Sequence, residues 1–526
     1  MKSNVFKYLF IIFVIIIAIG AFFIIQSNEN EQETQEDTSA EDTQEILREI
    51  RLGIAQYDTL NPLLTTNKNV QDITKLIFEP LVDISSDYKA TPVLATEWAK
   101  QDATTYIIKL RENVKWSNGE RFTSTDVQFT YDRLKENSSI YSSNLEHVTM
   151  LEVVDDYTIK MYLDQEVPFF EYYLTFPIMS KTFFDTQDYN DTGIISVGTG
   201  KYKVEEVQEN YITLTKNTNW WDRDTELSLE KITVNLYDSI GELYNAFKLG
   251  NVDMVSTNNN NIQEYIGTIG YSTKEIKGRE HDFIVLNTQN ELLSNQEVRR
   301  AISYSIDKSN IVSNVFQNKY YTSSFPLDFG SWVYQEQDVS SGYNPEQANQ
   351  LLSENGWSYR NGYWQKTLNR RTRRIELNLI VKASNGTQIS VAENIKTQLA
   401  SQGIIINIQQ YSDEQYNIAV QNKSYDMILC SMNLSPNPDM TLFFGENNLA
   451  NYATDEITNL MNEVKNTTDE QTIKNDYTRL AEIYKSDVPY ISLYTNKHTI
   501  AYNTELVGEI NSNWFNPFCG IETWYK

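Results

Sequence analysis

The sequence predicts an α/β fold divided into two or three lobes. The chain has 526 residues, too many for one simple hydrophobic core. Its composition is that of a globular protein, with 40% hydrophobic and 12% aromatic residues. Beyond the N-terminal segments, strands with apolar residues at period two alternate with amphipathic helices. No unit repeats at a spacing of roughly 20 to 50 residues, which excludes a solenoid or a propeller.

The first element along the chain is an apolar segment. Residues 8–25, YLFIIFVIIIAIGAFFII, carry no charge and follow Lys2 and Lys7. This length suits a membrane-spanning helix, and the two lysines place the N-terminus in the cytoplasm. A cleaved signal peptide is the alternative, because small residues within the run resemble a weak cleavage site. We expect residues 1–27 to anchor the protein in the cell membrane, with its body on the extracytoplasmic face.

An acidic segment follows the apolar one. Residues 28–45, NENEQETQEDTSAEDTQE, contain eight acidic residues and no basic one. Such a stretch has too little apolar surface to fold, and self-repulsion extends it. We expect residues 28–47 to be a disordered tether between the membrane and the folded body.

The clearest folded unit is a strand, a helix and a second strand. RIELNLIVK (374–382) places alternate apolar residues on one face. VAENIKTQLASQG (391–403) follows as a helix that Gly403 terminates. IIINIQQ (404–410) is the second strand, and these lengths predict a right-handed parallel crossover.

A polar loop, SMNLSPNPDM (431–440), follows a further apolar strand, YDMILCS (425–431). The loop therefore leaves the C-terminal end of a sheet strand, which is the edge where open α/β sheets usually bind ligands. Pro436 and Pro438 restrict φ and remove backbone donors, so they stiffen the loop. We expect it to form a ligand-facing wall.

Two further helices are predicted. RFTSTDVQFTYDRLK (121–135) opens with a capping box made by Thr123 and Asp126. NQEVRRAISYSIDKSNIV (295–312) reads as one helix with an apolar side. The residues on that side are Val298, Ile302 and Ile306.

Composition and motifs argue against nucleic-acid binding and catalysis. A net charge of −27 leaves no Lys/Arg-rich face for phosphates. The three histidines, His147, His281 and His498, lack the spacing of a zinc or iron site, and no hydrolase or phosphate-loop motif is present. We predict no catalytic residue, no metal site and no cofactor. Cys430 and Cys519, the only cysteines, are either one disulfide or two buried thiols.

Seven stretches, in order along the chain, resemble one known family. They are LNPLL with LIFEPL (60–81), TPVLATEWAKQDATTYIIKLRENVKWSNGERFTSTDVQFTYDRL (91–134), GTGKYKV (198–204), YNAFKLGNVDMV (244–255), FIVLNTQN with VRRAISYSIDKSNIV (283–312), YNPEQANQLLSENGW (343–357) and the helix–strand pair at 391–410. The family is that of the bacterial extracellular solute-binding proteins, family 5, of ABC importers for oligopeptides, dipeptides and nickel. The resemblance covers nearly everything from about residue 48 to the end.

The resemblance implies a two-lobed periplasmic-binding-protein-like fold of type II, with an extra subdomain and a hinge between the lobes. Ligand contacts to both lobes then favour the closed state. The expected parts are lobe I at 48–80, 200–280 and 499–526, its associated subdomain at 81–199, and lobe II at 281–498.

The implied function is that of the substrate-binding component of an ABC importer. A monomeric protein would bind a peptide between the lobes as an added strand and deliver it to the permease subunits. A modified peptide or a small oligosaccharide is the competing ligand. A sensor or scaffold with the same fold that does not support transport is the competing function. The nickel-binding branch is disfavoured, because the polar loop contains no histidine or aromatic anchor.

Carried over by position, the resemblance implies ligand-binding residues in four places. Many relatives carry a tryptophan where Met432 stands, and an aspartate near Ser435 that pairs with the α-amine of the ligand. Here Asp439 or a carboxylate elsewhere replaces that aspartate, or the ligand has no free amine, because a buried ammonium without a counter-charge is costly. The expected site residues are Thr65, Thr66 and Asn67; Tyr141; Asn258 and Asn259; and Met432, Asn433, Ser435, Asn437 and Asp439.

Overall fold

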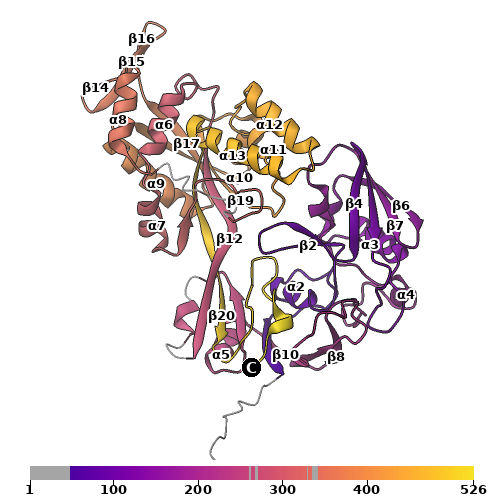
Figure 1. Ribbon diagram of the computed structural model, residues 1–526. Coiled ribbons are helices and arrows are strands. Elements are labelled where there is room, and N and C mark those ends of the chain that lie inside the picture. Colours follow the sequence, from indigo (N-terminus) through magenta and orange to yellow (C-terminus); the bar gives the residue numbers. More distant parts are fainter. Residues whose placement is uncertain (1–47, 260–261, 267–269, 328–329, 335–341) are drawn as a thin grey trace, which may run out of the picture. The chain divides into compact units, whose positions relative to one another are not determined.

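The computed structural model of the protein is shown in Figure 1. It describes residues 48–259, 262–266, 270–327, 330–334 and 342–526. The predicted membrane anchor and the predicted tether, residues 1–47, lie outside the described residues. Within the part of the chain that is described, no helix combines the length and apolarity needed to cross a bilayer.

Two four-stranded sheets dominate the N-terminal part of the body and share one hydrophobic core. In the first, β1 pairs in parallel with β10, and the remaining pairs are antiparallel. The second sheet is antiparallel throughout. Two short strands, β2 and β3, form a separate antiparallel pair between β1 and β4 in the sequence. In sheet order, the strands are β1 (Glu49–Ala55), β10 (Lys231–Tyr237), β9 (Tyr211–Lys216) and β8 (Tyr202–Val207); then β4 (Ala95–Asp102), β5 (Thr105–Leu110), β7 (Thr158–Leu163) and β6 (Val148–Asp155); and β2 (Val82–Ile84) with β3 (Ala90–Pro92).

The helix predicted from the capping box is confirmed as α3 (Ser124–Glu136). The Asp126 carboxylate accepts a hydrogen bond from the Thr123 N–H at 2.9 Å, which stabilises the first turn. Its apolar residues Val127, Tyr131 and Leu134 are buried in the same core. The other helices of this part are α2 (Lys68–Thr74), α4 (Lys181–Phe184) and α5 (Ile240–Lys248).

A seven-stranded mixed sheet forms the centre of the remaining chain, and two of its strands are unusually long. β12 and β20 pair antiparallel from Tyr271 opposite Asn503 to Val285 opposite Tyr490, with a register shift between Lys277 and His281. One end of each strand contributes to the first core, and the other end contributes to a second core. The lobe boundaries predicted near residues 280 and 498 fall within these strands and remain a prediction. In sheet order, the strands are β11 (Met254–Thr257), β20 (Tyr490–Asn503), β12 (Tyr271–Leu286), β19 (Met427–Asn433), β17 (Glu376–Lys382) and β18 (Ile405–Tyr411), with β13 (Tyr320–Thr322) on β20.

The predicted strand–helix–strand unit is confirmed. β17 and β18 pair in parallel and are connected by α9 (Gly386–Ser401), whose apolar side is buried against the sheet. Gly403 follows the helix with a φ of +76°, a conformation that favours glycine. β19 adds to β17 in parallel, so the polar loop does leave the C-terminal end of a sheet strand.

The single helix predicted at 295–312 is wrong, because the chain forms two helices there. α6 (Gln296–Tyr304) ends before Ile306, and α7 (Lys308–Phe316) starts after Asp307. The Asp307 carboxylate accepts a hydrogen bond from the Asn310 N–H at 3.0 Å, so this residue begins a new helix. The helices that follow are α8 (Pro345–Glu354), α10 (Asp413–Asn422), α11 (Thr441–Phe444), α12 (Asp455–Asn466) and α13 (Glu470–Asp487).

The two cysteines are free thiols. Cys430 is buried on β19, and the Tyr416 hydroxyl donates a hydrogen bond to its sulfur at 3.3 Å. Burial raises the pKa of the Cys430 thiol to about 11, so it stays protonated. Of the two alternatives, the structure has free thiols.

Candidate ligand-binding site

Arg279 of β12 holds the start of the polar loop, whose irregular part is residues 434–440. The Arg279 guanidinium donates from Nε to the Leu434 carbonyl at 2.9 Å and from Nη2 to the Ser435 carbonyl at 2.8 Å. The Leu434 N–H donates to the Arg279 carbonyl at 2.7 Å. The guanidinium also lies 5.0 Å from the ring centroid of Phe515. One buried side chain therefore fixes the base of the loop by charge-assisted hydrogen bonds and a ring contact.

The polar side chains of the loop bind their own backbone. Ser435 Oγ accepts from the Asn437 N–H at 3.1 Å, and Asn437 Oδ1 accepts from the Asp439 N–H at 2.9 Å. Asp439 Oδ1 accepts from the N–H of Thr441 at 2.9 Å and from its hydroxyl at 2.6 Å. These successive turns make the loop rigid. They also tie the Asp439 carboxylate to the start of α11.

The loop reaches a segment that is distant in sequence. Asn437 Nδ2 lies 3.5 Å from the carbonyl oxygens of both Pro168 and Phe169, just after β7. The Tyr477 hydroxyl of α13 donates to the Pro438 carbonyl from the other side. The loop is therefore held between α13 and the segment that follows β7.

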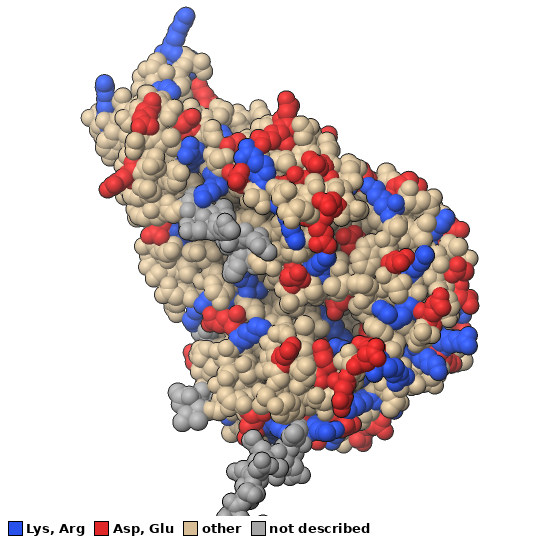
Figure 2. Space-filling view, in the orientation of Figure 1, with Lys and Arg blue, Asp and Glu red and all other residues tan. Residues whose placement is uncertain are grey.

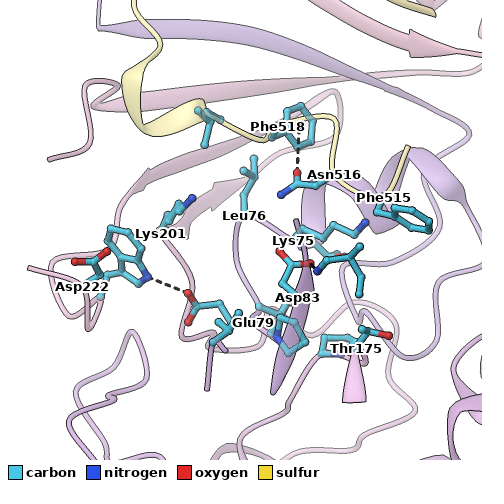
Figure 3. Close-up of a pocket in the computed structure, with 18 of the residues that line it drawn as sticks. Lys75, Leu76, Glu79, Asp83, Thr175, Lys201, Asp222, Phe515, Asn516 and Phe518 are labelled. Carbon is cyan, nitrogen blue, oxygen red and sulfur yellow. Dashed lines mark hydrogen bonds between the residues drawn. The ribbon is translucent and has the colours of Figure 1, made fainter. Parts of the chain in front are cut away.

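A cavity of about 390 Å³ lies beside Pro436 of this loop (Figure 3). Its walls combine aromatic and aliphatic side chains with carboxylates, amines and hydroxyls, which is the usual character of a small-molecule site. The lining residues are Thr74, Lys75, Leu76, Phe78, Glu79, Pro80, Asp83, Ile84, Pro92, Val93, Tyr141, Thr175, Pro177, Lys201, Trp220, Trp221, Asp222, Thr225, Pro436, Phe515, Asn516, Phe518, Ile521 and Glu522.

Glu79 fixes the two indoles of the cavity wall. Its Oε1 accepts from Trp220 Nε1 and its Oε2 from Trp221 Nε1, each at 2.9 Å. The carboxyl group is buried, and burial raises its pKa to about 7 against an ordinary value of 4.5. Both oxygens are occupied, so the side chain orients the wall.

Other charged groups on the walls are also paired. Lys201 Nζ lies 2.9 Å from Glu522 Oε2, and the Asp222 carboxylate accepts from the Thr225 hydroxyl at 2.7 Å. Lys75 Nζ lies 3.7 Å from Asp72 Oδ1, and burial lowers the pKa of this amine.

Asp83 and Glu522 each keep one carboxylate oxygen without a hydrogen-bond donor among the described residues, and of these two only Glu522 is in an ion pair. Asp83 Oδ1 accepts from the N–H of Ile84 at 2.8 Å, and its Oδ2 has no hydrogen-bond donor among the described residues. The side chain is half-buried and lies near Lys75 in the cavity, as Figure 3 shows. Asp83 therefore has hydrogen-bonding capacity left for a ligand.

Of the predicted site residues, only Tyr141 lines this cavity. Thr65 Oγ1 donates to Asp58 Oδ1 at 2.7 Å, and the Thr66 N–H donates to Asp58 Oδ2 at 3.0 Å. Asn67 caps α2 by accepting from the Asn69 N–H at 3.0 Å. These contacts stabilise the turn before α2 and the start of the helix, and the role of the three residues in binding remains a prediction.

The remaining predicted residues lie on two other segments. Asn258 is exposed directly after β11, and the Asn259 N–H donates to Thr257 Oγ1 at 2.9 Å. Met432 is half-buried against a core cluster, and Asn433 is exposed at the end of β19. Their contact with a ligand also remains a prediction.

Sequence reasoning missed most of the wall. Trp220 and Trp221 stand adjacent in the sequence, which is the one local signal for this wall. Lys75 and Asp83 flank the LIFEPL stretch, which carries family resemblance but no ligand-binding motif. Phe515 reaches the cavity from a C-terminal loop that has no periodic pattern.

Two of the histidines, His281 and His498, are buried and each contacts a serine hydroxyl. Burial lowers the pKa of His281 to about 3, and Ser492 Oγ lies 3.2 Å from its Nε2. Burial lowers the pKa of His498 to about 4, and Ser256 Oγ lies 2.8 Å from its Nε2. Both imidazoles are therefore neutral near pH 7. Among the residues that the structure covers, no three His, Cys, Asp or Glu side chains are grouped to hold a metal.

The body has hydrophobic cores at both ends of two long strands and carries a cavity with mixed apolar and polar walls. Residues 89–451 match the family of bacterial extracellular solute-binding proteins, family 5. The chain belongs to this family. It is the extracytoplasmic substrate-binding component of an ABC importer, and the prediction of a binding protein rather than an enzyme is confirmed.

Known proteins of the family differ in what their names say they bind. The chain is 23% identical to the oligopeptide-binding protein AppA of Bacillus subtilis over 484 residues, 87% of each chain. It is 24% identical to the nickel-binding periplasmic protein of Escherichia coli, over 66% of this chain and 68% of the relative. The unliganded, open form of the periplasmic murein tripeptide-binding protein MppA has the same fold, with a TM-score of 0.77 and 18% identity over 91% of this chain and 98% of that one. The predicted two-lobed fold is confirmed by this likeness.

Proposed function

We propose that the protein binds peptides in the cavity beside the polar loop and delivers them to the permease subunits of an ABC importer. The observation that carries the proposal is the mixed wall of this cavity, in which indole and phenyl rings stand beside carboxylates and amines. Apolar peptide side chains can pack on the rings, and the charged peptide termini can form charge-assisted hydrogen bonds with the carboxylates and amines. The name of the Bacillus relative, an oligopeptide-binding protein that aligns over 87% of the chain, supports the same ligand class.

Asp83 is the group that we propose for the free α-ammonium of the peptide. A buried ammonium requires a counter-charge, and the carboxylate of the polar loop is already tied to Thr441. Asp83 lines the cavity with an oxygen that accepts no hydrogen bond from the described residues. A cavity carboxylate outside the loop would thus replace the aspartate that many relatives carry in the loop.

The proposed ligand class is tested most simply by identifying the small molecules that co-purify with the protein. The full chain is purified from its native membrane, and the small molecules released on denaturation are identified by mass spectrometry. Tri- to hexapeptides are the expected result. Bound nickel or an oligosaccharide in their place would contradict the proposal.

Transport is tested separately from binding. The gene is introduced into a strain that lacks its own peptide receptor but retains the permease, and uptake of a labelled peptide is measured. Receptor-dependent uptake is expected. Peptide binding without uptake would instead support the sensor or scaffold.

A further inference from the structure

A three-stranded hairpin sheet carries a concentration of positive charge in this acidic protein. It consists of β14 (Ser358–Arg360), β15 (Tyr363–Leu368) and β16 (Arg371–Arg374). Residues 358–374, named the basic hairpin here, contain five arginines and one lysine and no acidic residue. The whole chain has a net charge of −27, so the local charge is opposite to that of the protein.

The hairpin projects from the body at the end that carries α8. Figure 1 shows β15 and β16 extending past the neighbouring helices, and Figure 2 shows Lys and Arg side chains at this tip. The turn at Asn369 and Arg370 has positive φ at both positions, +47° and +63°, as in a tight two-residue hairpin turn. The charge is therefore presented on a narrow, convex element.

Four of the arginines have no acidic partner among the described residues. Arg373 pairs with Glu291 at 3.2 Å, and Lys366 donates to the Asn355 carbonyl at 2.8 Å. The other four are exposed, and one of them stacks at 4.8 Å on the ring of the half-buried Tyr363. They are Arg360, Arg370, Arg371 and Arg374.

This arrangement does not serve the stability of the hairpin. Lys366 and Arg373 lie directly opposite each other on β15 and β16, and like charges in this position reduce the stability of a sheet. Packing is supplied instead by the buried Trp364 of β15. Guanidinium groups match the geometry of phosphate oxygens, to which they donate two parallel hydrogen bonds. The cluster therefore fits a phosphate-bearing partner better than it fits the protein itself.

We propose that the basic hairpin docks on the headgroups of anionic phospholipids at the membrane surface. Clusters of four to eight Lys and Arg residues bind such surfaces. Tyr359, which is 54% exposed on β14, adds an aromatic side chain of the kind found at membrane interfaces. The repulsion between the acidic body and the lipid is also screened, with a Debye length of about 8 Å at physiological salt. This inference does not depend on the identity of the transported solute.

The test uses the full chain in vesicles of phosphatidylcholine, with and without phosphatidylglycerol. Hydrogen–deuterium exchange of residues 358–374 is measured in both. Phosphatidylglycerol is expected to slow exchange about tenfold at low salt, and high salt is expected to restore it. Equal exchange rates in the two lipids would overturn the proposal. Slow exchange in both lipids that varies with protein concentration would also overturn it, because the partner would then be the acidic surface of a second copy.

A matched pair of variants assigns the effect to the hairpin. Replacing the four unpaired arginines by glutamine is expected to abolish the protection by phosphatidylglycerol. The control replaces four exposed or half-exposed lysines elsewhere and is expected to keep it. If the control loses protection equally, the attraction is not specific to the hairpin and the proposal fails. The salt response of the unaltered protein provides a test that does not require the variants to fold. The control set is Lys203, Lys248, Lys396 and Lys485.

Discussion

The polar loop and the opposite cavity wall differ in how much of their hydrogen-bonding capacity is left for a ligand. The loop is rich in polar residues, yet its side chains bind loop backbone, and Asp439 binds Thr441. The wall has fewer polar residues, but Asp83 keeps an oxygen that accepts no hydrogen bond from the described chain. Polar composition alone therefore does not identify the residues that bind. We expect groups with unused hydrogen-bonding capacity, such as the Asp83 carboxylate, to be better candidates.

The largest effect is expected from removing the side chain that holds the loop. Arg279→Leu leaves the Leu434 and Ser435 carbonyls without their donor and should lower the free energy of unfolding by about 3 kcal/mol. Arg279→Lys keeps the charge but cannot reproduce both bonds, so an intermediate loss is expected. Arg300→Leu, at a half-exposed position, serves as the control and should cost under about 1 kcal/mol. Chemical denaturation measures all three, and equal losses at both positions would show that the loop base has no special role.

Glu79 should make stability depend on pH. Its pKa is about 7 in the folded protein and 4.5 ordinarily, so the folded state holds the proton more tightly. The resulting stabilisation is complete below about pH 4.5 and is lost as the pH rises through about 7. The free energy of unfolding should therefore fall by about 3 kcal/mol over this range.

Glu79→Gln removes this titration, although it also places an amide NH₂ against one indole N–H and lowers stability at every pH. Thermal unfolding from acidic to neutral pH should therefore show a shallower decline for the variant than for the parent protein. Parallel declines would mean that Glu79 does not titrate as inferred.

Asp83 should control recognition of the peptide amine. Asp83→Asn removes the negative charge and is expected to weaken binding of free-amine peptides about 10- to 100-fold, because a charge-assisted bond contributes about 1.5–3 kcal/mol. Asp222→Asn, whose carboxylate is already bonded to Thr225, is the matched control and should change affinity little. Titration calorimetry compares them. A larger loss in the Asp222 variant would move the ammonium site to the other side of the cavity.

The smallest effect is expected at Asp439. Asp439→Ala removes the hydrogen bonds to Thr441 and should lower the free energy of unfolding by about 1 kcal/mol, the usual net contribution of such a bond. Peptide affinity should stay within about threefold of the parent value, since less than 1 kcal/mol of binding energy is at stake. A loss as large as that of the Asp83 variant would restore Asp439 as the counter-charge of the ligand.

The sequence predicts helices and strands correctly where local patterns agree with the tertiary structure. The crossover at 374–410 and the helix capped by Thr123 were predicted, because period, caps and terminating glycine all indicate the same elements. The break between α6 and α7 was missed, since the apolar spacing continues across it while Asp307 starts a new helix.

The candidate site was less predictable, because its walls come from segments far apart in the chain. Trp220, Phe515 and Pro436 meet only after folding, and no local pattern connects them. Family likeness directed attention to the polar loop but could not show that its carboxylate is already bonded. That information depends on side-chain geometry, which spacing does not specify.

The most direct test of peptide binding compares two peptides. Titration calorimetry of the full chain is performed with one tripeptide in its free form and with the same tripeptide N-acetylated. The account predicts saturable binding of the free tripeptide at a single site, and an affinity about 10- to 100-fold lower for the acetylated form. Equal binding of both would contradict the role of Asp83 while leaving peptide binding intact. If neither peptide binds to protein from which endogenous ligand has been removed, the proposed function itself is contradicted.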